Sequence, residues 1–148
     1  NEIEYLTCFK IESAQAASKI RALIKNCSKK LDAPFDGEES ITLYADLEAG
    51  ISGSMSSALL PEKIAPVIDH FWNNEKDKAE EIYNNILPLI NFENRQCGFR
   101  ATKTVMKEGG VIKSDFCRDP IKPLDQDTKN LLLNFAKRYD LLTYKWGK

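Results

Sequence analysis

Histidine and paired cysteines are what this sequence most plainly lacks. It has one histidine, His70, and four cysteines, at positions 8, 27, 97 and 117, with no C-x-x-C pair among them. Zinc sites and disulfide frameworks need ligands at close, regular spacing, so this pattern argues against both. We therefore expect no metal site, a structural role for His70, and free thiols of the kind found in cytoplasmic proteins.

Blocks of one charge and long apolar runs are also missing. The net charge is −1, and the lysines and arginines do not gather in one segment. This argues against nucleic-acid binding and against a membrane-surface patch. No apolar run approaches the length that spans a bilayer, and the first residues do not resemble a signal peptide. The 148 residues are enough for one ordinary globular domain with a core.

The stretch from Tyr5 to Glu12 (Y-L-T-C-F-K-I-E) holds one lysine, Lys10, within an otherwise apolar run. Its length and its aromatic and β-branched residues predict a buried strand. Side chains alternate along a strand, so Leu6, Cys8, Lys10 and Glu12 share one face. An unpaired ammonium is costly to bury, whereas a desolvated neutral amine is the nucleophile of Schiff-base chemistry. The alternative is that Lys10 lies at a strand end and reaches water.

The pattern after this strand alternates between helix and strand. Ser13 is placed to cap a helix that continues to Cys27, and a brief strand is predicted over 31–35. A second helix is predicted over 39–48, with Gly50 placed to end it. Residues 51–58 (I-S-G-S-M-S-S-A) are interpreted as a third strand, with a flexible linker as the alternative.

From Leu59 onward every predicted element is a helix. The expected ranges are 60–74, 77–91, 97–107 and 125–139. Pro61 suits a first turn, Asp77 is placed as a cap, and Pro66 and Pro88 predict bends inside their helices. We expect 1–74 to form three β/α units and 75–148 to form a helical extension. Three short parallel strands leave open edges, which favours part of a larger α/β barrel.

Several motifs occur in an order that resembles a known family. They are C-F-K-I-E around Lys10, D-G-E-E from Asp36, A-G-I-S-G-S-M-S-S-A over 49–58, R-A-T-K over 100–103, a Gly-Gly turn, and Arg118-x-Pro120. The chain resembles the C-terminal half of the dihydrodipicolinate synthase / N-acetylneuraminate lyase family of class I (β/α)8 barrels. Within it, E-N-R-Q-C-G over 93–98, the segment 106–115 and Y-K-W-G over 144–147 are most similar to L-2-keto-3-deoxyarabonate dehydratases.

The resemblance implies that Lys10 is the Schiff-base lysine on the sixth barrel strand. It implies a 2-keto acid substrate, no metal and no organic cofactor. It also implies that Gly37 and Glu39, after the seventh strand, and Ser54 and Met55, at the end of the eighth, line the substrate site. The alternative for Glu39 is a carboxylate that complements a helix dipole. Sites of this fold lie at the carboxyl ends of the strands.

Two parts of the family's active site do not match any segment of this sequence. The carboxylate-binding Gly-Thr-Thr segment and the proton-relay tyrosine lie on earlier strands, and Tyr5 is not a substitute because it faces away from Lys10. Together with the start at Asn1 rather than Met, this leads us to expect a chain that begins in mid-barrel and lacks its N-terminal half.

Three functions remain open at this point. The favoured one is dehydration of a 2-keto-3-deoxy sugar acid by a homotetrameric cytoplasmic enzyme, with the isolated chain inactive. A pyruvate-dependent aldolase or a dihydrodipicolinate synthase would use the same iminium. A non-catalytic half-barrel that serves only in assembly is the alternative of another class.

Overall fold

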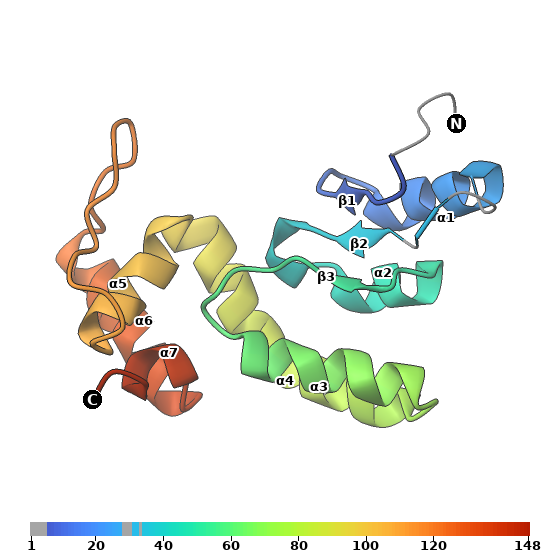
Figure 1. Ribbon diagram of the computed structural model, residues 1–148. Helices are drawn as coiled ribbons and strands as arrows, with labels where there is room; N and C mark the ends of the chain where they lie inside the picture. The colour runs from blue at the N-terminus through green and yellow to red at the C-terminus, as the bar shows by residue number, and fades with distance from the viewer. Residues whose placement is uncertain (1–5, 28–30, 33) are drawn as a thin grey trace. The chain divides into compact units, whose positions relative to one another are not determined.

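The computed structural model describes residues 6–27, 31–32 and 34–148 (Figure 1). Tyr5 and the first part of the predicted Lys10 strand lie outside these residues. The chain forms two compact units: one consists of Asn1–Ser56 and Pro66–Tyr83, and the other of Ser57–Ala65 and Asn84–Lys148. The predicted division at residue 74 remains a prediction.

Three short parallel strands form the sheet of the first unit. They are β1 (Lys10–Ile11), β2 (Phe35–Asp36) and β3 (Gly53–Ser54), in the order β1-β2-β3. In the register of the sheet, Lys10, Phe35 and Gly53 are neighbours, and Ile11, Asp36 and Ser54 form the next row. The three predicted strands are therefore present, and residues 51–58 contain a strand rather than a flexible linker.

Two helices follow the first two strands and pack against each other (Figure 1). They are α1 (Ala16–Cys27) and α2 (Leu43–Ala49), and their buried residues include Ile20, Leu43 and Leu47. Right-handed β-α-β crossovers between neighbouring strands place both helices on one face of the sheet. Gly50 ends α2 with a φ of 100°, as expected. Ser13 does not cap α1, because the helix begins at Ala16 and the Ser13 hydroxyl accepts a hydrogen bond from Lys19.

The expectation of a buried Lys10 strand is wrong in one respect. Exposure alternates along the run as expected, but the face with Leu6, Cys8, Lys10 and Glu12 is the exposed one. The ladder is also only two residues long. Three strands cannot curl into a closed barrel, so the face that a barrel would enclose stays open to water.

Two proline-containing helices come after β3. They are α3 (Pro61–Trp72), which begins at Pro61 as expected, and α4 (Lys76–Phe92). Both continue without a break through Pro66 and Pro88, so α3 is not divided into two short helices. Asp77 lies inside the first turn of α4 and is not its cap. In the first unit, Tyr44 of α2 stacks on Tyr83 with ring centroids 6.4 Å apart.

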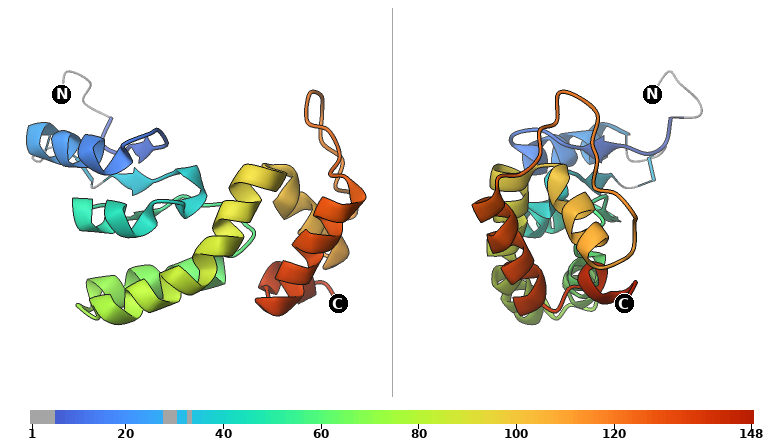
Figure 2. Two further views of the ribbon diagram at one scale, coloured as in Figure 1. Left: turned by 180° about the vertical axis from the view of Figure 1, so that it is seen from behind. Right: turned by 90° about the vertical axis from the view of Figure 1, so that its left-hand side faces the viewer.

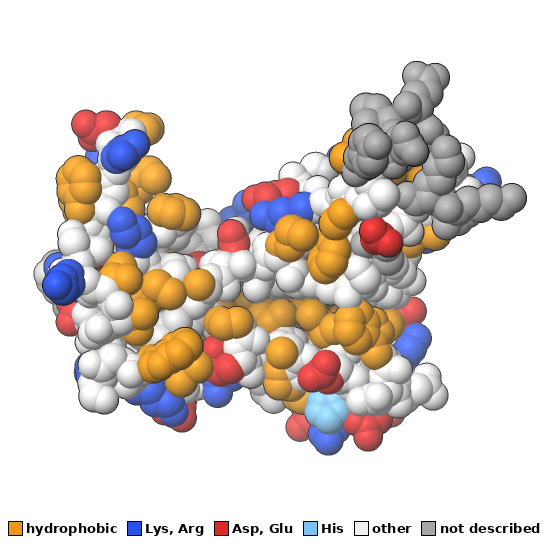
Figure 3. Space-filling model, in the orientation of Figure 1, with side chains coloured by type: hydrophobic (Ala, Val, Ile, Leu, Met, Phe, Trp, Pro, Cys, Tyr) orange, Lys and Arg blue, Asp and Glu red, His pale blue; other side chains and the backbone are white. Residues whose placement is uncertain are grey.

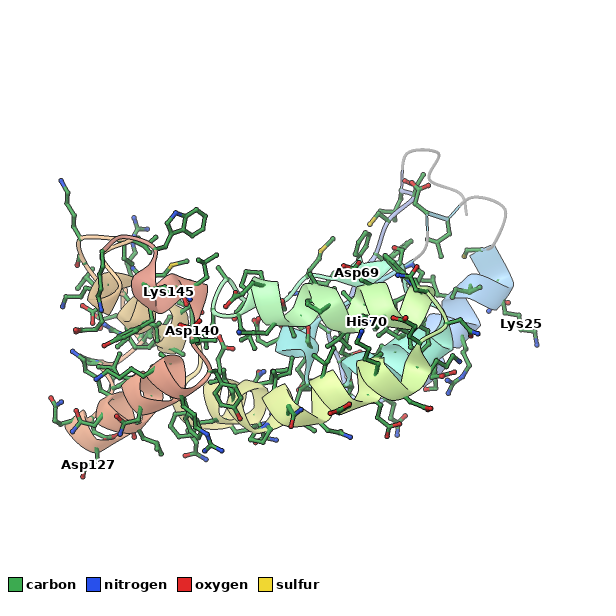
Figure 4. All side chains as sticks on the ribbon, turned by 90° about the horizontal axis from the view of Figure 1, so that it is seen from below. Lys25, Asp69, His70, Asp127, Asp140 and Lys145 are labelled. Carbon is green, nitrogen blue, oxygen red and sulfur yellow. The ribbon has the colours of Figure 1, made fainter. Side chains whose placement is uncertain are left out.

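The surface of the first unit carries the only histidine of the sequence. His70 is the pale blue side chain in Figure 3, where acidic side chains surround it, and Figure 4 labels it beside Asp69 on α3. Its Nδ1 atom pairs with the Glu75 carboxylate. This surface contact with Glu75 fits the structural role expected for His70.

The second unit is built of helices. After α4 come a short π-helix, η2 (Glu93–Cys97), then α5 (Arg100–Glu108), α6 (Gln126–Arg138) and α7 (Leu142–Lys145). Asp125 caps α6 by accepting a hydrogen bond from the Thr128 N–H at 2.9 Å. Near α7, Lys145 pairs with Asp140 at 2.5 Å (Figure 4). The helical tail was predicted, whereas η2 and α7 were not.

The connection between α5 and α6 extends away from these helices as a long loop (Figure 2). Its first two residues, Gly109 and Gly110, lie against the backbone near the C-terminus. A Cβ atom on Gly109 would lie 2.0 Å from the Thr143 carbonyl oxygen, so only glycine fits there. In the part of the chain that the structure describes, no helix is long and apolar enough to cross a membrane.

Candidate active site

Lys10 lies at the carboxyl end of the sheet, where loops follow the strands. Its Nζ atom is 2.6 Å from Glu12 Oε2, and its side chain is 34% exposed. In the sheet, Lys10 lies in one row with Phe35 and Gly53, and its side chain is partly exposed to water. A ligand could reach it without any displacement of the backbone.

Gly37 forms part of the surface next to Lys10. A Cβ atom placed on Gly37 would lie 3.0 Å from Lys10 Cε and 2.8 Å from the Ile11 carbonyl oxygen. The backbone after β2 thus approaches β1 so closely that a larger side chain would push the lysine aside. This contact joins two of the predicted site residues, Lys10 and Gly37.

The turn after Gly37 has an unusual backbone. Glu38, Glu39 and Ser40 all have positive φ values, of 49°, 55° and 67°. Non-glycine residues seldom adopt this left-handed conformation, and three in succession need strong support from their surroundings. The predicted helix over 39–48 is wrong at its start for this reason, because its first regular turn begins only at Leu43.

A buried set of polar side chains supports the turn from the helix-covered face of the sheet. The Ser54 hydroxyl donates to Asp36 Oδ2 at 2.7 Å and lies 2.6 Å from the Ser40 hydroxyl. Asp36 is 1% exposed and Ser40 is fully buried. From α4, the Tyr83 hydroxyl donates to the carbonyl oxygens of Ile41, at 2.7 Å, and Ser40, at 3.2 Å.

A second carboxyl group, that of Asp46 on α2, is buried in the same place. Asp46 is 0% exposed, and its Oδ2 atom accepts a hydrogen bond from the Thr42 hydroxyl at 2.7 Å. Burial raises the pKa of Asp36 from 3.8 to about 7; the Ser54 hydrogen bond opposes that rise, and the neighbouring Asp46 carboxyl adds to it. Burial also raises the pKa of Tyr83, and the charges of Asp36 and Asp46 raise it further.

The remaining predicted site residues fall in different places around Lys10. Glu39 is half-buried within the left-handed turn, and Met55 follows β3 with 42% exposure. Ser54 lies in the row with Ile11 and Asp36, one position beyond the Lys10 row. Its hydroxyl is hydrogen-bonded to Asp36 and Ser40. All five residues therefore lie at the same end of the sheet, and their contacts with substrate remain predictions.

Sequence reasoning missed Asp36, Ser40, Asp46 and Tyr83. The predicted strand over 31–35 ended one residue before Asp36, whereas β2 includes it. A signal for Asp46 was present, because it lies three residues after Leu43 and next to Leu47 on the apolar face of the predicted helix. A carboxylate on such a face predicts a buried polar contact.

All four cysteines are free thiols, as expected. Cys8 is exposed on the Lys10 face, and Cys97 and Cys117 are buried in the second unit. Burial raises the pKa of the Cys97 thiol from 9.0 to about 11, with Glu93 contributing. Such a thiol stays protonated at neutral pH and is a poor nucleophile.

Parallel β/α units with an accessible lysine on one strand are an arrangement that (β/α)8 barrels share with other α/β folds. The chain belongs to the dihydrodipicolinate synthetase family, whose model matches residues 2–138. It is 44% identical over 146 residues to L-2-keto-3-deoxyarabonate dehydratase of Azospirillum brasilense, covering 99% of this chain and 47% of the relative.

Solved structures agree on the fold. Dihydrodipicolinate synthase from Aquifex aeolicus matches with a TM-score of 0.78 and 22% identity, over 95% of this chain and 47% of that one. N-acetylneuraminate lyase from Fusobacterium nucleatum matches with a TM-score of 0.77 and 20% identity, over 93% and 46%. The fold is thus the C-terminal part of a (β/α)8 barrel followed by a helical tail. The chain spans about half the length of the curated relatives it matches.

Proposed function

We propose that this chain carries the Schiff-base lysine of a lyase that acts on 2-keto acids, and that this lysine is Lys10. The observation that supports the proposal is the position of Lys10: an accessible amine at the carboxyl end of a barrel strand, beside a glycine that leaves it room. The 44% identity to a dehydratase supports L-2-keto-3-deoxyarabonate, or a closely similar sugar acid, as the substrate.

The chemistry needs one neutral amine and no metal. Lys10 attacks the C2 ketone, and the carbinolamine loses water to give an iminium ion, which acts as an electron sink. A base removes a proton from C3, and the resulting enamine electrons expel the C4 hydroxyl, which leaves as water after it takes up a proton. The unsaturated iminium then loses protons from C5 and from the C5 hydroxyl and gains protons at C3 and at C4, which converts the C5 alcohol into an aldehyde. Hydrolysis of the iminium releases this semialdehyde and restores the amine. Nζ must lose its proton and its contact with the Glu12 carboxylate before the attack, because only a neutral amine has a free lone pair.

The other predicted residues form the wall of the site in this proposal. Gly37 keeps the space beside Lys10 open, Glu39 contacts substrate hydroxyls, and Ser54 and Met55 border the site through the backbone at the end of β3. The carboxylate-binding and proton-relay groups come from an N-terminal half that completes the barrel. The complete protein is a cytoplasmic homotetramer, and these 148 residues alone do not turn over substrate.

Borohydride trapping tests this proposal. The complete protein is incubated with pyruvate or with 2-keto-3-deoxy-L-arabonate, reduced with borohydride and digested for mass spectrometry. We expect an adduct on Lys10 in the wild type and none in Lys10→Ala. Lys25→Ala, which removes an exposed lysine at the end of α1 (Figure 4), is the matched control and should trap normally.

The same experiment separates the alternatives. Absence of an adduct on the complete wild-type protein would refute the lyase and favour the non-catalytic half-barrel. Release of a semialdehyde from the deoxy sugar acid identifies a dehydratase. Turnover only with pyruvate plus an aldehyde identifies an aldolase or a synthase, which the 27% identity to a 4-hydroxy-tetrahydrodipicolinate synthase of Geotalea daltonii makes the runner-up.

A further inference from the structure

Two carboxyl groups are buried on the helix-covered face of the sheet, opposite Lys10. Asp36 and Asp46 are 1% and 0% exposed, and each has one oxygen atom, Oδ1, that is buried and accepts no hydrogen bond from a described residue. Their other oxygens accept hydrogen bonds from hydroxyl groups, those of Ser54 and Thr42. Burial raises the pKa of Asp36 to about 7, and the neighbouring Asp46 carboxyl adds to the rise, so the protonated form of Asp36 is favoured below that pH.

The hydroxyl groups connect this pair to the left-handed turn. Asp36 holds the Ser54 hydroxyl at 2.7 Å, and Ser54 holds the Ser40 hydroxyl at 2.6 Å. Ser40 is the last of the three consecutive residues with positive φ. A turn of this kind persists only where its surroundings determine it, and the Asp36–Ser54–Ser40 chain supplies that support from the sheet.

The other end of the turn is in contact with Lys10. Gly37 is adjacent to Asp36 in the sequence, and a Cβ on Gly37 would lie 3.0 Å from Lys10 Cε and 2.7 Å from Glu12 Cβ. A shift of the turn by a fraction of an ångström would therefore move the wall beside the amine. Asp36 faces away from Lys10, so any effect that it has on the amine passes through the backbone of the turn.

We infer that Asp36 is a positioning residue for the Lys10 site, because its hydrogen bond with Ser54, and through Ser54 with Ser40, fixes the Gly37–Ser40 turn against the lysine. This inference rests on the proposed function of Lys10. The titratable groups facing Asp36 are Asp46 on α2 and the Tyr83 phenol on α4, while β3 and the turn contribute the hydroxyls of Ser54 and Ser40. Ionisation of Asp36 strengthens its hydrogen bond with Ser54 but places a buried charge next to the Asp46 carboxyl, and this repulsion loosens the turn.

Two substitutions test the hydrogen bonds of Asp36 and its charge independently. Asp36→Asn keeps the acceptor for Ser54 and adds an N–H₂ donor that faces Asp46, so it imitates the protonated form of Asp36. Asp36→Ala removes the support altogether. Asp69→Asn is the matched control, because Asp69 is an exposed aspartate on α3 of the same unit (Figure 4).

The measured quantity is the rate of borohydride-trapped adduct on Lys10 of the complete protein with pyruvate, from pH 6 to pH 9. We expect Asp36→Ala to slow trapping roughly ten-fold, as misplacement of a reactive group does. Asp36→Asn should trap within about two-fold of the wild type at pH 6, and the ratio of its rate to the wild-type rate should rise with pH. Asp69→Asn should follow the wild type throughout.

Any other result contradicts either the positioning role of Asp36 or the proposed function of Lys10. An adduct that forms equally fast in the wild type and in folded Asp36→Ala refutes the positioning role alone, and no adduct in the wild type refutes the proposed function on which it rests. If Asp36→Ala does not fold, the pH-dependent ratio for Asp36→Asn decides. An infrared difference spectrum of wild type minus Asp36→Asn should show a protonated carboxyl at pH 6 that disappears by pH 9, and its absence at pH 6 contradicts the protonation of Asp36.

Discussion

Both units bury carboxyl groups that accept hydrogen bonds from hydroxyls, but among the described residues only the second unit also buries an arginine. In the first, Asp36 and Asp46 lie near each other with hydroxyl partners, and Asp36 has a pKa of about 7. In the second, Glu93 accepts hydrogen bonds from Ser57 at 2.5 Å and Thr102 at 3.1 Å. There the Arg100 guanidinium donates to the carbonyl oxygens of Asp115 and Ile121, at 2.8 and 2.9 Å.

Arg100 keeps its charge at any ordinary pH, whereas the raised pKa of Asp36 lets this group change its protonation state near neutral pH. Arg100 therefore joins α5 to the long loop under all conditions. The first unit uses groups of one sign, which makes its order depend on a single proton. The hydrogen bonds of Arg100 stabilise the second unit at any ordinary pH. In the first unit, the raised pKa of Asp36 makes the geometry of the Lys10 site depend on pH.

Removal of Arg100 should have the largest effect on stability. Arg100→Ala deletes two charge-assisted hydrogen bonds and leaves a cavity, because the side chain is only 6% exposed. We expect a loss of about 3–5 kcal/mol in the free energy of unfolding, measured by urea denaturation. Arg100→Lys should recover only part, because an ammonium group lacks the planar fork that reaches both carbonyls. Lys122→Ala, an exposed change in the same loop, should cost almost nothing. If Arg100→Ala and Lys122→Ala lowered the free energy of unfolding equally, the Arg100 hydrogen bonds would not stabilise the second unit.

The next largest expected effect is the change of stability with pH caused by Asp36. Its direction follows from the difference between the pKa values of Asp36 in the folded and unfolded states. Burial raises the pKa of Asp36 from 3.8 to about 7, so between these values the folded protein holds a proton that the unfolded chain has released. The stabilising contribution is complete below about pH 4 and is lost as the pH rises through about 7. Asp36→Asn cannot lose that proton. Its stability relative to the wild type should therefore increase with pH, by on the order of 3 kcal/mol between pH 4 and pH 9.

Urea titrations at several pH values measure this increase, with Asp69→Asn as the control for removal of an exposed carboxylate. A constant difference between Asp36→Asn and the wild type across the range would show that Asp36 is ionised in the folded protein at every pH. The comparison between the two units would then fail, because both would bury permanent charges.

Local signals predicted the ends of elements better than the buried polar groups. Gly50 after α2 and Pro61 at the start of α3 were found, because they depend on residues close in sequence, whereas the caps predicted at Ser13 and Asp77 were wrong. The strands were predicted too long, since the number of ladder residues depends on the partner strand. The left-handed turn over 38–40 could not be predicted, because Glu-Glu-Ser favours a helix start and only the buried hydroxyls and Tyr83 make another conformation stable.

The candidate site shows the same limit. Lys10 was found as an anomaly within a strand, and Gly37 followed from the resemblance of D-G-E-E to the family. Asp36 and Asp46 lie ten residues apart in the sequence and come together through the packing of α2 against the sheet. A carboxyl group that looks like part of a polar turn therefore becomes one of the least exposed groups of the unit.

The smallest expected effect comes from a matched pair of serines, one in each unit. Ser57 donates to Glu93, and Ser54 donates to Asp36, at 2.5 and 2.7 Å. Ser57→Ala should lower the free energy of unfolding by about 1–2 kcal/mol with little change between pH 5 and pH 9, because it removes a hydrogen bond to a permanently placed carboxylate. Ser54→Ala should cost about 1 kcal/mol at pH 5 and more at pH 9, since a hydroxyl stabilises the ionised form of Asp36 more than the protonated form.

The same Ser54 variant also distinguishes its two proposed roles at the Lys10 site. If the hydroxyl acts through Asp36 and the turn, Ser54→Ala slows trapping of pyruvate, which has no hydroxyl for a serine to contact. If it binds substrate directly, trapping of pyruvate is unchanged and only KM for the deoxy sugar acid rises. If the free energies of unfolding of Ser57→Ala and Ser54→Ala changed with pH in the same way, Glu93 and Asp36 would titrate alike. The proposed difference between the two units would then be wrong.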